Sequence, residues 1–292
     1  MAIRDCLGPR PARTPRWVPP PGAWDTHFHV LGPQARWPYA AERKYTPPDA
    51  PLAEALRLHE ALGIARGLVV HANTHGFDND VDLDAVARSN GRYFAVVRLD
   101  ARATRAGCES LHAQGVRGVR FAFNPQHGGA LDRAVFDHVL RCVEGLGWFI
   151  ELHFQAEALP GLRAWLESLS VTLVIDHFAR VDPSHGVQGE SFGMLCALMR
   201  RSNVWVKLSG ADRITHTDAP YEDVAPLARR LAAIAPERLL WGSDWPHTGV
   251  FDATRMPCDA GLLDAVPAWF PERAMQERLL VTNPLRLLGL GA

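Results

Sequence analysis

Short apolar segments alternate along this chain with longer stretches in which apolar residues recur at helical spacing. Eight apolar segments have the length and composition of strands, and they lie at residues 23–30, 67–73, 93–100, 116–123, 148–154, 171–178, 204–210 and 239–244. Helices are expected between them, at residues 52–62, 81–89, 106–114, 132–146, 160–169, 192–201 and 221–235. This alternation is typical of parallel strands joined by helices.

Eight strands with intervening helices predict an α/β fold, a (β/α)8 TIM barrel in a single domain, and 292 residues suit one such domain. Residues 1–20 are rich in proline and are expected to form an arm outside a barrel that occupies residues 21–292. An open doubly wound sheet would show the same alternation. However, no GxGxxG or GxxxxGK[ST] motif follows the first strand, so the closed barrel is favoured.

Composition and charge narrow the choice of partners. The net charge is −1 and residues of both signs are interspersed, so no basic field is available for nucleic acid. No apolar run reaches the roughly 18 residues of a membrane span, and the N-terminus lacks the apolar stretch of a secretory signal. The five scattered cysteines form no CxxC pair. These features predict a cytoplasmic protein that binds a small molecule and neither nucleic acid nor membrane; they leave the oligomeric state open.

Polar side chains stand near the carboxyl ends of most predicted strands, namely His27, His29, Asn73, Arg98, Arg120, His153, His177, Lys207 and Asp244. In a barrel these ends converge on one face, where active sites of this fold are built. His27 and His29 are two positions apart on a strand, so their side chains point to the same side. The sequence therefore predicts an active site around His27, His29, His177 and Asp244.

Several motifs resemble those of the amidohydrolase superfamily, within it the branch of 2-pyrone-4,6-dicarboxylate lactonase and the sugar-acid lactonases. They are DTHFHV at 25–30, HGFDN at 75–79, GVRGVRF at 115–121, IDHFAR at 175–180, VKLSGADR at 206–213 and GSDWPH at 242–247. The resemblance covers about residues 22–290. It implies that Asp244 acts on water and that His177 lies near the substrate carbonyl.

Lactone hydrolysis needs a base for water, a donor for the carbonyl oxygen, and anchors for the rest of the substrate. Asp244 suits the first task and the imidazoles suit the second. Arg120, Arg180 and Arg213 suit the third, because guanidinium groups bind carboxylates through two hydrogen bonds. Further substrate contacts are expected from His27, His29, Asn73, His75, His153 and His247. We therefore expect a hydrolase that opens a small carboxylated lactone, such as a pyrone, a muconolactone or a sugar-acid lactone.

Three alternatives remain open on the same barrel: a metal-dependent decarboxylase of an aromatic or unsaturated acid, a lactone isomerase, and a binding protein without activity. The stretch 123–127, FNPQH, lacks a second basic residue that the pyrone-dicarboxylate lactonases carry there, which argues against that substrate. No GxSxG motif is present, which disfavours a serine nucleophile.

The sequence also leaves two cases open for a cofactor. His27, His29, His153 and Asp244 would suit one zinc or manganese ion with a position left for water. The resemblance implies a reaction without metal, with a tyrosine at the strand-five position that His153 occupies here. A second ion is not expected, because the fourth strand ends near Arg120 without a lysine or glutamate to bridge two metals.

Other polar residues are expected in structural positions. Asp176 should lie on the strand face opposite to His177 and bond to backbone or a helix, and Arg117 should pack toward a helix. Five histidines on predicted helices or loops are expected at the surface: His59, His112, His138, His185 and His216.

Overall fold

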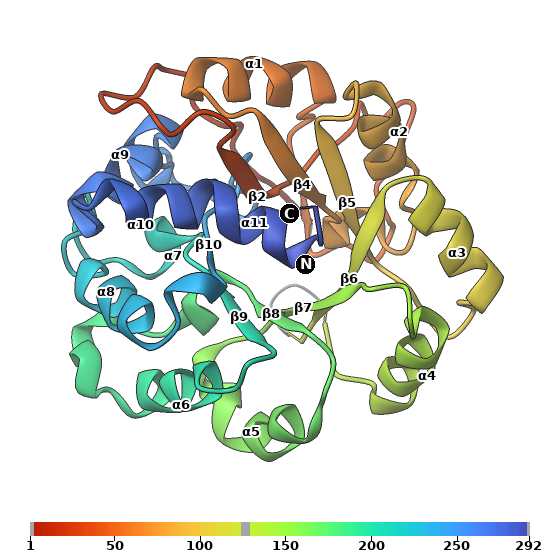
Figure 1. The fold of residues 1–292 in the computed structure, drawn as a ribbon. Helices are drawn as coiled ribbons and strands as arrows, with labels where there is room; N and C mark the ends of the chain where they lie inside the picture. Colours follow the sequence, from red (N-terminus) through yellow and green to blue (C-terminus); the bar gives the residue numbers. More distant parts are fainter. Residues whose placement is uncertain (1–2, 124–128, 291–292) are drawn as a thin grey trace.

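Eight parallel strands form the centre of the structure, a computed structural model that describes residues 3–123 and 129–290 (Figure 1). In the order in which they pair, the strands are β2 (Trp24–Phe28), β4 (Arg66–Val70), β5 (Tyr93–Val97), β6 (Val116–Ala122), β7 (Phe149–His153), β8 (Leu173–Ile175), β9 (Val204–Lys207) and β10 (Leu239–Leu240). Each neighbouring pair is parallel. All eight predicted strands are present, although most are shorter than predicted.

Backbone hydrogen bonds between the first strand and the segment after β10 close the ring. Thr26 N–H donates to the Trp241 carbonyl (2.9 Å), and Asp244 N–H donates to the His27 carbonyl (2.8 Å). Only a glycine fits at position 242, because a Cβ atom there would lie 2.5 Å from the Cβ of His27. The fold is therefore the predicted (β/α)8 barrel.

Helices surround the strands (Figure 1). They are α1 (Leu52–Leu62), α2 (Asp80–Arg88), α3 (Arg105–Ala113), α4 (Arg133–Val143), α5 (Leu159–Ser168), α6 (Glu190–Met199), α7 (Ala211–Ile214), α8 (Ala225–Ile234), α9 (Asp259–Trp269), α10 (Arg273–Glu277) and α11 (Asn283–Leu287). Local chemistry sets some of their ends: Asp132 caps α4 by accepting from two backbone N–H groups, and Gly63 ends α1 at a φ of 72°. The sequence did not predict α7 or the three C-terminal helices, two of which have only five residues each. In the described part of the chain, no helix is long and apolar enough to span a membrane.

The barrel interior is filled in layers. Alternate strand residues form an apolar cluster inside the ring, made of Leu68, Val70, Val96, Phe149, Val174, Trp205 and Leu240. Leu287 and Leu288, at the end of α11, pack against this cluster, and Figure 1 shows the C-terminal segment crossing one mouth of the barrel. That mouth is thereby covered, and polar groups are left for the opposite end, where the strands terminate.

The N-terminal arm is attached to the barrel. Its short strand β1 (Arg4–Asp5) pairs with β3 (Tyr45–Thr46), and the backbone N–H of Trp17 donates to Asp264 (2.9 Å). The arm therefore packs on the barrel, first against the loop that carries β3 and then against α9, instead of trailing from the domain.

Candidate active site

A cavity lies at the carboxyl ends of the barrel strands. Its lining residues are His29, Tyr45, Ala72, Asn73, Arg120, His153, His177, Arg180, Arg213, Asp244 and Thr248. Eight of these were assigned to the site from sequence, and His27 lies beneath them without solvent exposure. Convergence of strand ends, which the sequence pattern predicts, thus gathers these groups in one place.

Asp244 stands at the centre of this cavity and is 5% exposed. Arg213 holds one carboxylate oxygen, Oδ2, through Nε (3.0 Å) and Nη2 (2.9 Å). The other oxygen, Oδ1, faces the Nε2 atoms of three histidines: His29 at 3.5 Å, His27 at 3.6 Å and His177 at 3.8 Å. Burial alone would raise the pKa of Asp244, but Arg213 and His177 hold it well below its ordinary value. Asp244 is therefore an ionised carboxylate with one oxygen available for chemistry.

The two histidines of the HxH pair are oriented by different partners. His29 Nδ1 lies 2.6 Å from the Val70 carbonyl oxygen, which only accepts hydrogen bonds, so Nδ1 carries the proton. In the neutral ring, the lone pair is then on Nε2, which faces the cavity. His27 Nε2 has no hydrogen-bond partner among the described residues. Burial and the charge of Lys207 lower the pKa of His27 to about 3, so this ring is neutral.

A left-handed turn brings His177 and Arg180 into the cavity. The four residues from His177 to Arg180 have φ values of 53° to 57°, a region that costs about 1–2 kcal/mol per non-glycine residue. His177 Nδ1 lies 2.8 Å from Ser209 Oγ, which fixes the ring, and burial lowers its pKa well below the ordinary value. The strained backbone of this turn places the side chains of both His177 and Arg180 in the cavity.

The turn also corrects the expectation for Asp176. Strand β8 ends at Ile175, and Asp176 follows the alternation of Val174 into the barrel interior, whereas His177 reaches the cavity only because the chain turns after the strand. Arg120 donates to Asp176 Oδ2 through Nε (3.1 Å) and Nη2 (2.9 Å). Asp176 is thus an internal partner of Arg120 instead of a residue on the outer face.

A buried ionic network lies under the cavity and reaches it at Arg120. It joins Arg120 and Lys207 to Glu151 and Asp176, with His27 above them. Lys207 Nζ donates to Glu151 Oε2 and, at 3.1 Å, to His27 Nδ1. Glu151 and Lys207 have no assigned role in the sequence analysis, although both belong to strands whose alternate residues face inward. Burial of charge at this depth requires such mutual pairing.

The three arginines of the site differ in how many of their hydrogen-bond donors are free to bind a substrate. Arg120 is engaged by Asp176, and Arg213 by Asp244 and the Thr248 carbonyl (2.9 Å). The guanidinium of Arg180 makes no hydrogen bond or ion pair with any described residue, and its Nε is buried. Burial and the nearby Arg213 lower the pKa of Arg180 to about 10, so it remains a cation at neutral pH.

Two predicted substrate contacts lie outside the cavity lining. His247 pairs with Asp259 (3.0 Å), and His75 packs against the ring of Tyr39. His59 is also not at the surface as expected: it is completely buried between Asp25 (3.3 Å) and the Tyr93 hydroxyl (2.7 Å). Arg117 does pack toward a helix as predicted, because it donates to the His112 carbonyl at the end of α3.

The structure adds three lining residues that were not singled out from sequence, Tyr45, Ala72 and Thr248. Tyr45 donates its hydroxyl hydrogen bond to Thr248 Oγ1 (2.9 Å), and both side chains line the cavity. Tyr45 comes from the loop that pairs with the N-terminal arm, and such a loop carries no periodic signal. Of the FNPQH stretch noted above, residues 124–127 lie outside the described residues.

A group of donors that could hold one metal ion is present. The ligand atoms of His27, His177 and Asp244 lie within 4.8 Å of one another, as do those of His27, Glu151 and Asp176. His29 and His153, which the sequence analysis placed in the ligand set, belong to neither group. His177, which was not in that set, belongs to the first group with His27 and Asp244.

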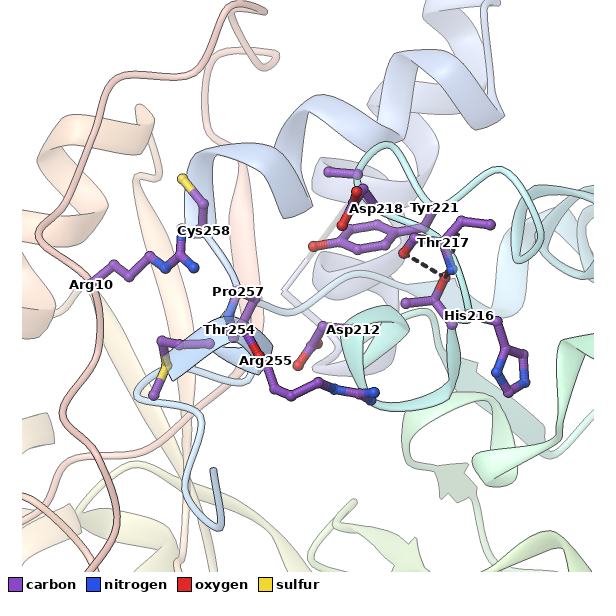
Figure 2. A pocket seen from close by; sticks show the side chains of 13 residues that line it. Arg10, Asp212, His216, Thr217, Asp218, Tyr221, Thr254, Arg255, Pro257 and Cys258 are labelled. Carbon is purple, nitrogen blue, oxygen red and sulfur yellow. Dashed lines mark hydrogen bonds between the residues drawn. The ribbon is translucent and has the colours of Figure 1, made fainter. Parts of the chain in front are cut away.

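A second, larger cavity of about 440 Å³ lies beside the loop after β9 (Figure 2). Asp212, Tyr221 and Arg255 line it, together with Arg10 from the N-terminal arm. None of the residues that line the first cavity lines this one. The combination of an ionised carboxylate, imidazoles and an unpaired guanidinium makes the first cavity the candidate active site.

Comparisons with known proteins agree with this fold. The sequence profile of the family described as Amidohydrolase matches residues 24–290. The 4-sulfomuconolactone hydrolase of Hydrogenophaga intermedia is 49% identical over 286 residues, which cover 97% of this chain and 94% of that protein. The 2-pyrone-4,6-dicarboxylate hydrolase of Comamonas testosteroni is 39% identical, over 94% of this chain and 92% of that protein. A solved structure of an Agrobacterium tumefaciens protein is 32% identical, with a TM-score of 0.82 over 97% of this chain and 99% of that chain.

Proposed function

Because this chain belongs to the amidohydrolase family, we propose that it hydrolyses the lactone ring of a small acid that carries a carboxylate or a sulfonate. The names of its relatives, hydrolases of 4-sulfomuconolactone and of 2-pyrone-4,6-dicarboxylate, support a lactone as substrate. The observation that carries the proposal is that one cavity holds both Asp244, whose Oδ1 faces the cavity, and the guanidinium of Arg180, which pairs with no described residue. One supplies a base and the other an anchor for an anion.

Asp244 acts as the general base. Its Oδ1 lies 3.5 Å from His29 Nε2, and both atoms are acceptors. A water on the cavity side of this pair can donate one hydrogen bond to each atom. Asp244 takes a proton from this water as the water oxygen attacks the lactone carbonyl carbon. Arg213 leaves Oδ1 unoccupied and keeps the carboxylate in position through Oδ2.

The imidazoles of His27 and His177 polarise the carbonyl oxygen and stabilise the charge that develops on it. The tetrahedral intermediate then collapses, and the bond from the carbonyl carbon to the ring oxygen breaks. The departing oxygen takes the proton from Asp244. One lactone and one water thereby give one hydroxyl group and one carboxylic acid, and Asp244 is ionised again.

Arg180 binds the acidic substituent of the substrate. A hydrogen bond to a charged group contributes about 1.5–3 kcal/mol, and a carboxylate or sulfonate can accept two from one guanidinium. Arg120 and Arg213, assigned the same task from sequence, are held by Asp176 and Asp244 and serve to position those groups.

A divalent metal does not fit the hydrogen bonds that the candidate ligands make. Their spacing alone would suit an ion, since two ligands at about 2.1 Å in tetrahedral geometry lie about 3.4 Å apart. However, Arg213 donates twice to Asp244, and Lys207 donates to His27 Nδ1, which leaves the ring proton on Nε2 and no lone pair there for a metal. We therefore propose hydrolysis without metal. Activity that disappears after chelation and returns with about one equivalent of zinc or manganese would overturn this part.

A substrate panel tests the reaction. We would measure acid release in a pH-stat for 4-sulfomuconolactone, unsulfonated muconolactone, 2-pyrone-4,6-dicarboxylate and neutral butyrolactone, with mass spectrometry and a sulfite assay of the products. Hydrolysis predicts one new carboxylic acid for each ring opened and a preference for the charged lactones. Isomerisation releases no acid and leaves the mass unchanged, and decarboxylation removes CO2, so either result would replace the proposed reaction.

A further inference from the structure

A lysine without solvent exposure lies directly beneath His27. Lys207 is the last residue of β9, and its side chain points into the barrel interior. Its ammonium nitrogen is hydrogen-bonded to Glu151 Oε2 and to His27 Nδ1, the second at 3.1 Å, and lies 3.7 Å from Asp176 Oδ1. The mechanism above gives Lys207 no direct contact with substrate.

We infer that Lys207 is a positioning residue that fixes the tautomer of His27, with the ring proton on Nε2. An ammonium group only donates hydrogen bonds, so His27 Nδ1 must accept this one. A neutral imidazole carries a single proton, which then lies on Nε2 and points into the cavity. The tautomer follows from this hydrogen bond alone. The role of the Nε2 proton in catalysis rests on the proposed function.

Two carboxylate oxygens near the same ring nitrogen favour the opposite tautomer. Asp176 Oδ1 lies 3.3 Å and Glu151 Oε1 3.5 Å from His27 Nδ1. Neither forms a hydrogen bond with it, because among the described residues both oxygens lack a hydrogen-bond partner. Lys207 Nζ lies closer to His27 Nδ1 and has the geometry of a hydrogen bond, so it determines which ring nitrogen carries the proton. Without its ammonium, these carboxylates would draw the proton to Nδ1.

The two histidines of the HxH pair therefore have different roles. His29 is fixed by the Val70 carbonyl with its lone pair toward the cavity, and His27 is fixed by Lys207 with its N–H toward the cavity. One ring accepts a hydrogen bond from the attacking water, and the other donates to the carbonyl oxygen. His27 lies in β2, His29 directly follows the strand, and both Nε2 atoms face Asp244 Oδ1, so their partners on β4 and β9 make them chemically different.

The tautomer can be measured without a substrate. Long-range proton–nitrogen NMR spectra of the deuterated, ¹⁵N-labelled full-length protein distinguish a ring nitrogen that bears a proton from one with a lone pair, and the His27→Gln variant assigns the signals. We expect a protonated Nε2 on His27 in the wild type and a protonated Nδ1 in Lys207→Met. Lys44→Met is the matched control, because Lys44 is exposed, and it should leave the tautomer unchanged.

Kinetics provide a second readout. Lys207→Met should lower kcat by about tenfold or more with little change in KM, since loss of one oxyanion donor elsewhere costs about 10²–10³-fold. A wild-type His27 with its proton on Nδ1 would overturn the inference even if Lys207→Met fails to fold. An unchanged tautomer in a folded Lys207→Met would overturn it as well. Failure of the lactonase assay alone would affect the proposed reaction and leave the tautomer result standing.

Discussion

Replacing Asp244 by asparagine removes the proposed base with the smallest change in shape. The backbone at Asp244 has a φ of 62°, in the left-handed region that asparagine adopts more readily than most residues. The amide oxygen can still accept from Arg213, and Arg213 keeps its hydrogen bond to the Thr248 carbonyl. The variant should therefore fold with the same backbone.

The expected loss follows from the role of the carboxylate. An amide does not take a proton from water at neutral pH, and general-base catalysis contributes about 10²–10⁴-fold. At about 1.36 kcal/mol for each factor of ten, this corresponds to roughly 2.7–5.4 kcal/mol of transition-state free energy. The loss should appear in kcat, because Arg180 still anchors the substrate and KM depends on that contact.

The assay is acid release in the pH-stat on the best lactone of the panel, with thermal unfolding followed by circular dichroism. Asp182→Asn is the control, because it removes an exposed carboxylate that pairs with His216 on the surface (2.9 Å). That variant should keep wild-type kinetics. Near-full activity in a folded Asp244→Asn protein would refute the assignment of Asp244 as base, since no other carboxylate lines the cavity in the described part of the chain.

Three further results are expected. Arg180→Met should lower kcat/KM for charged lactones by roughly tenfold or more, since a hydrogen bond to a charged group is worth about 1.5–3 kcal/mol, and it should spare neutral butyrolactone; equal losses on both would contradict an anion anchor. Burial lowers the pKa of His177, and Arg213 together with the neighbouring histidines lowers the pKa of Asp244 against the effect of burial, so both groups resist protonation as the pH falls. The kcat/KM profile should therefore stay level through about pH 6.5, the ordinary histidine pKa, and an acid limb at that pH would count against this. Tyr93→Phe should lower the free energy of unfolding by about 1–3 kcal/mol in urea melts, because it leaves a buried ring nitrogen of His59 unpaired, while an unchanged midpoint would show that this contact contributes nothing.

The sequence determined the architecture and the location of the site. Apolar runs at regular intervals imply parallel strands, and the carboxyl ends of parallel strands in a barrel meet at one face, so polar residues at those ends are expected together. His27, His29, His177 and Asp244 were found by this reasoning, and the structure brings their side chains within 3.8 Å of a shared atom, Asp244 Oδ1. The strand boundaries were predicted less well: the segments 171–178 and 239–244 contain strands of only three and two residues, β8 and β10.

Only the tertiary structure decided which way certain side chains face and which charges pair. Alternation along a strand fixes direction only while the strand continues. Asp176 therefore faces the barrel interior, contrary to expectation, and the left-handed turn that begins at His177 still brings His177 into the cavity. Ion pairs depend on distances between strands that are far apart in sequence. The sequence therefore could not show that Arg120 and Arg213 serve internal carboxylates while Arg180 pairs with none of the residues that the structure describes. The same holds for Lys207, which became significant only when closure of the barrel brought the side chains of Lys207 on β9 and His27 on β2 together in the interior.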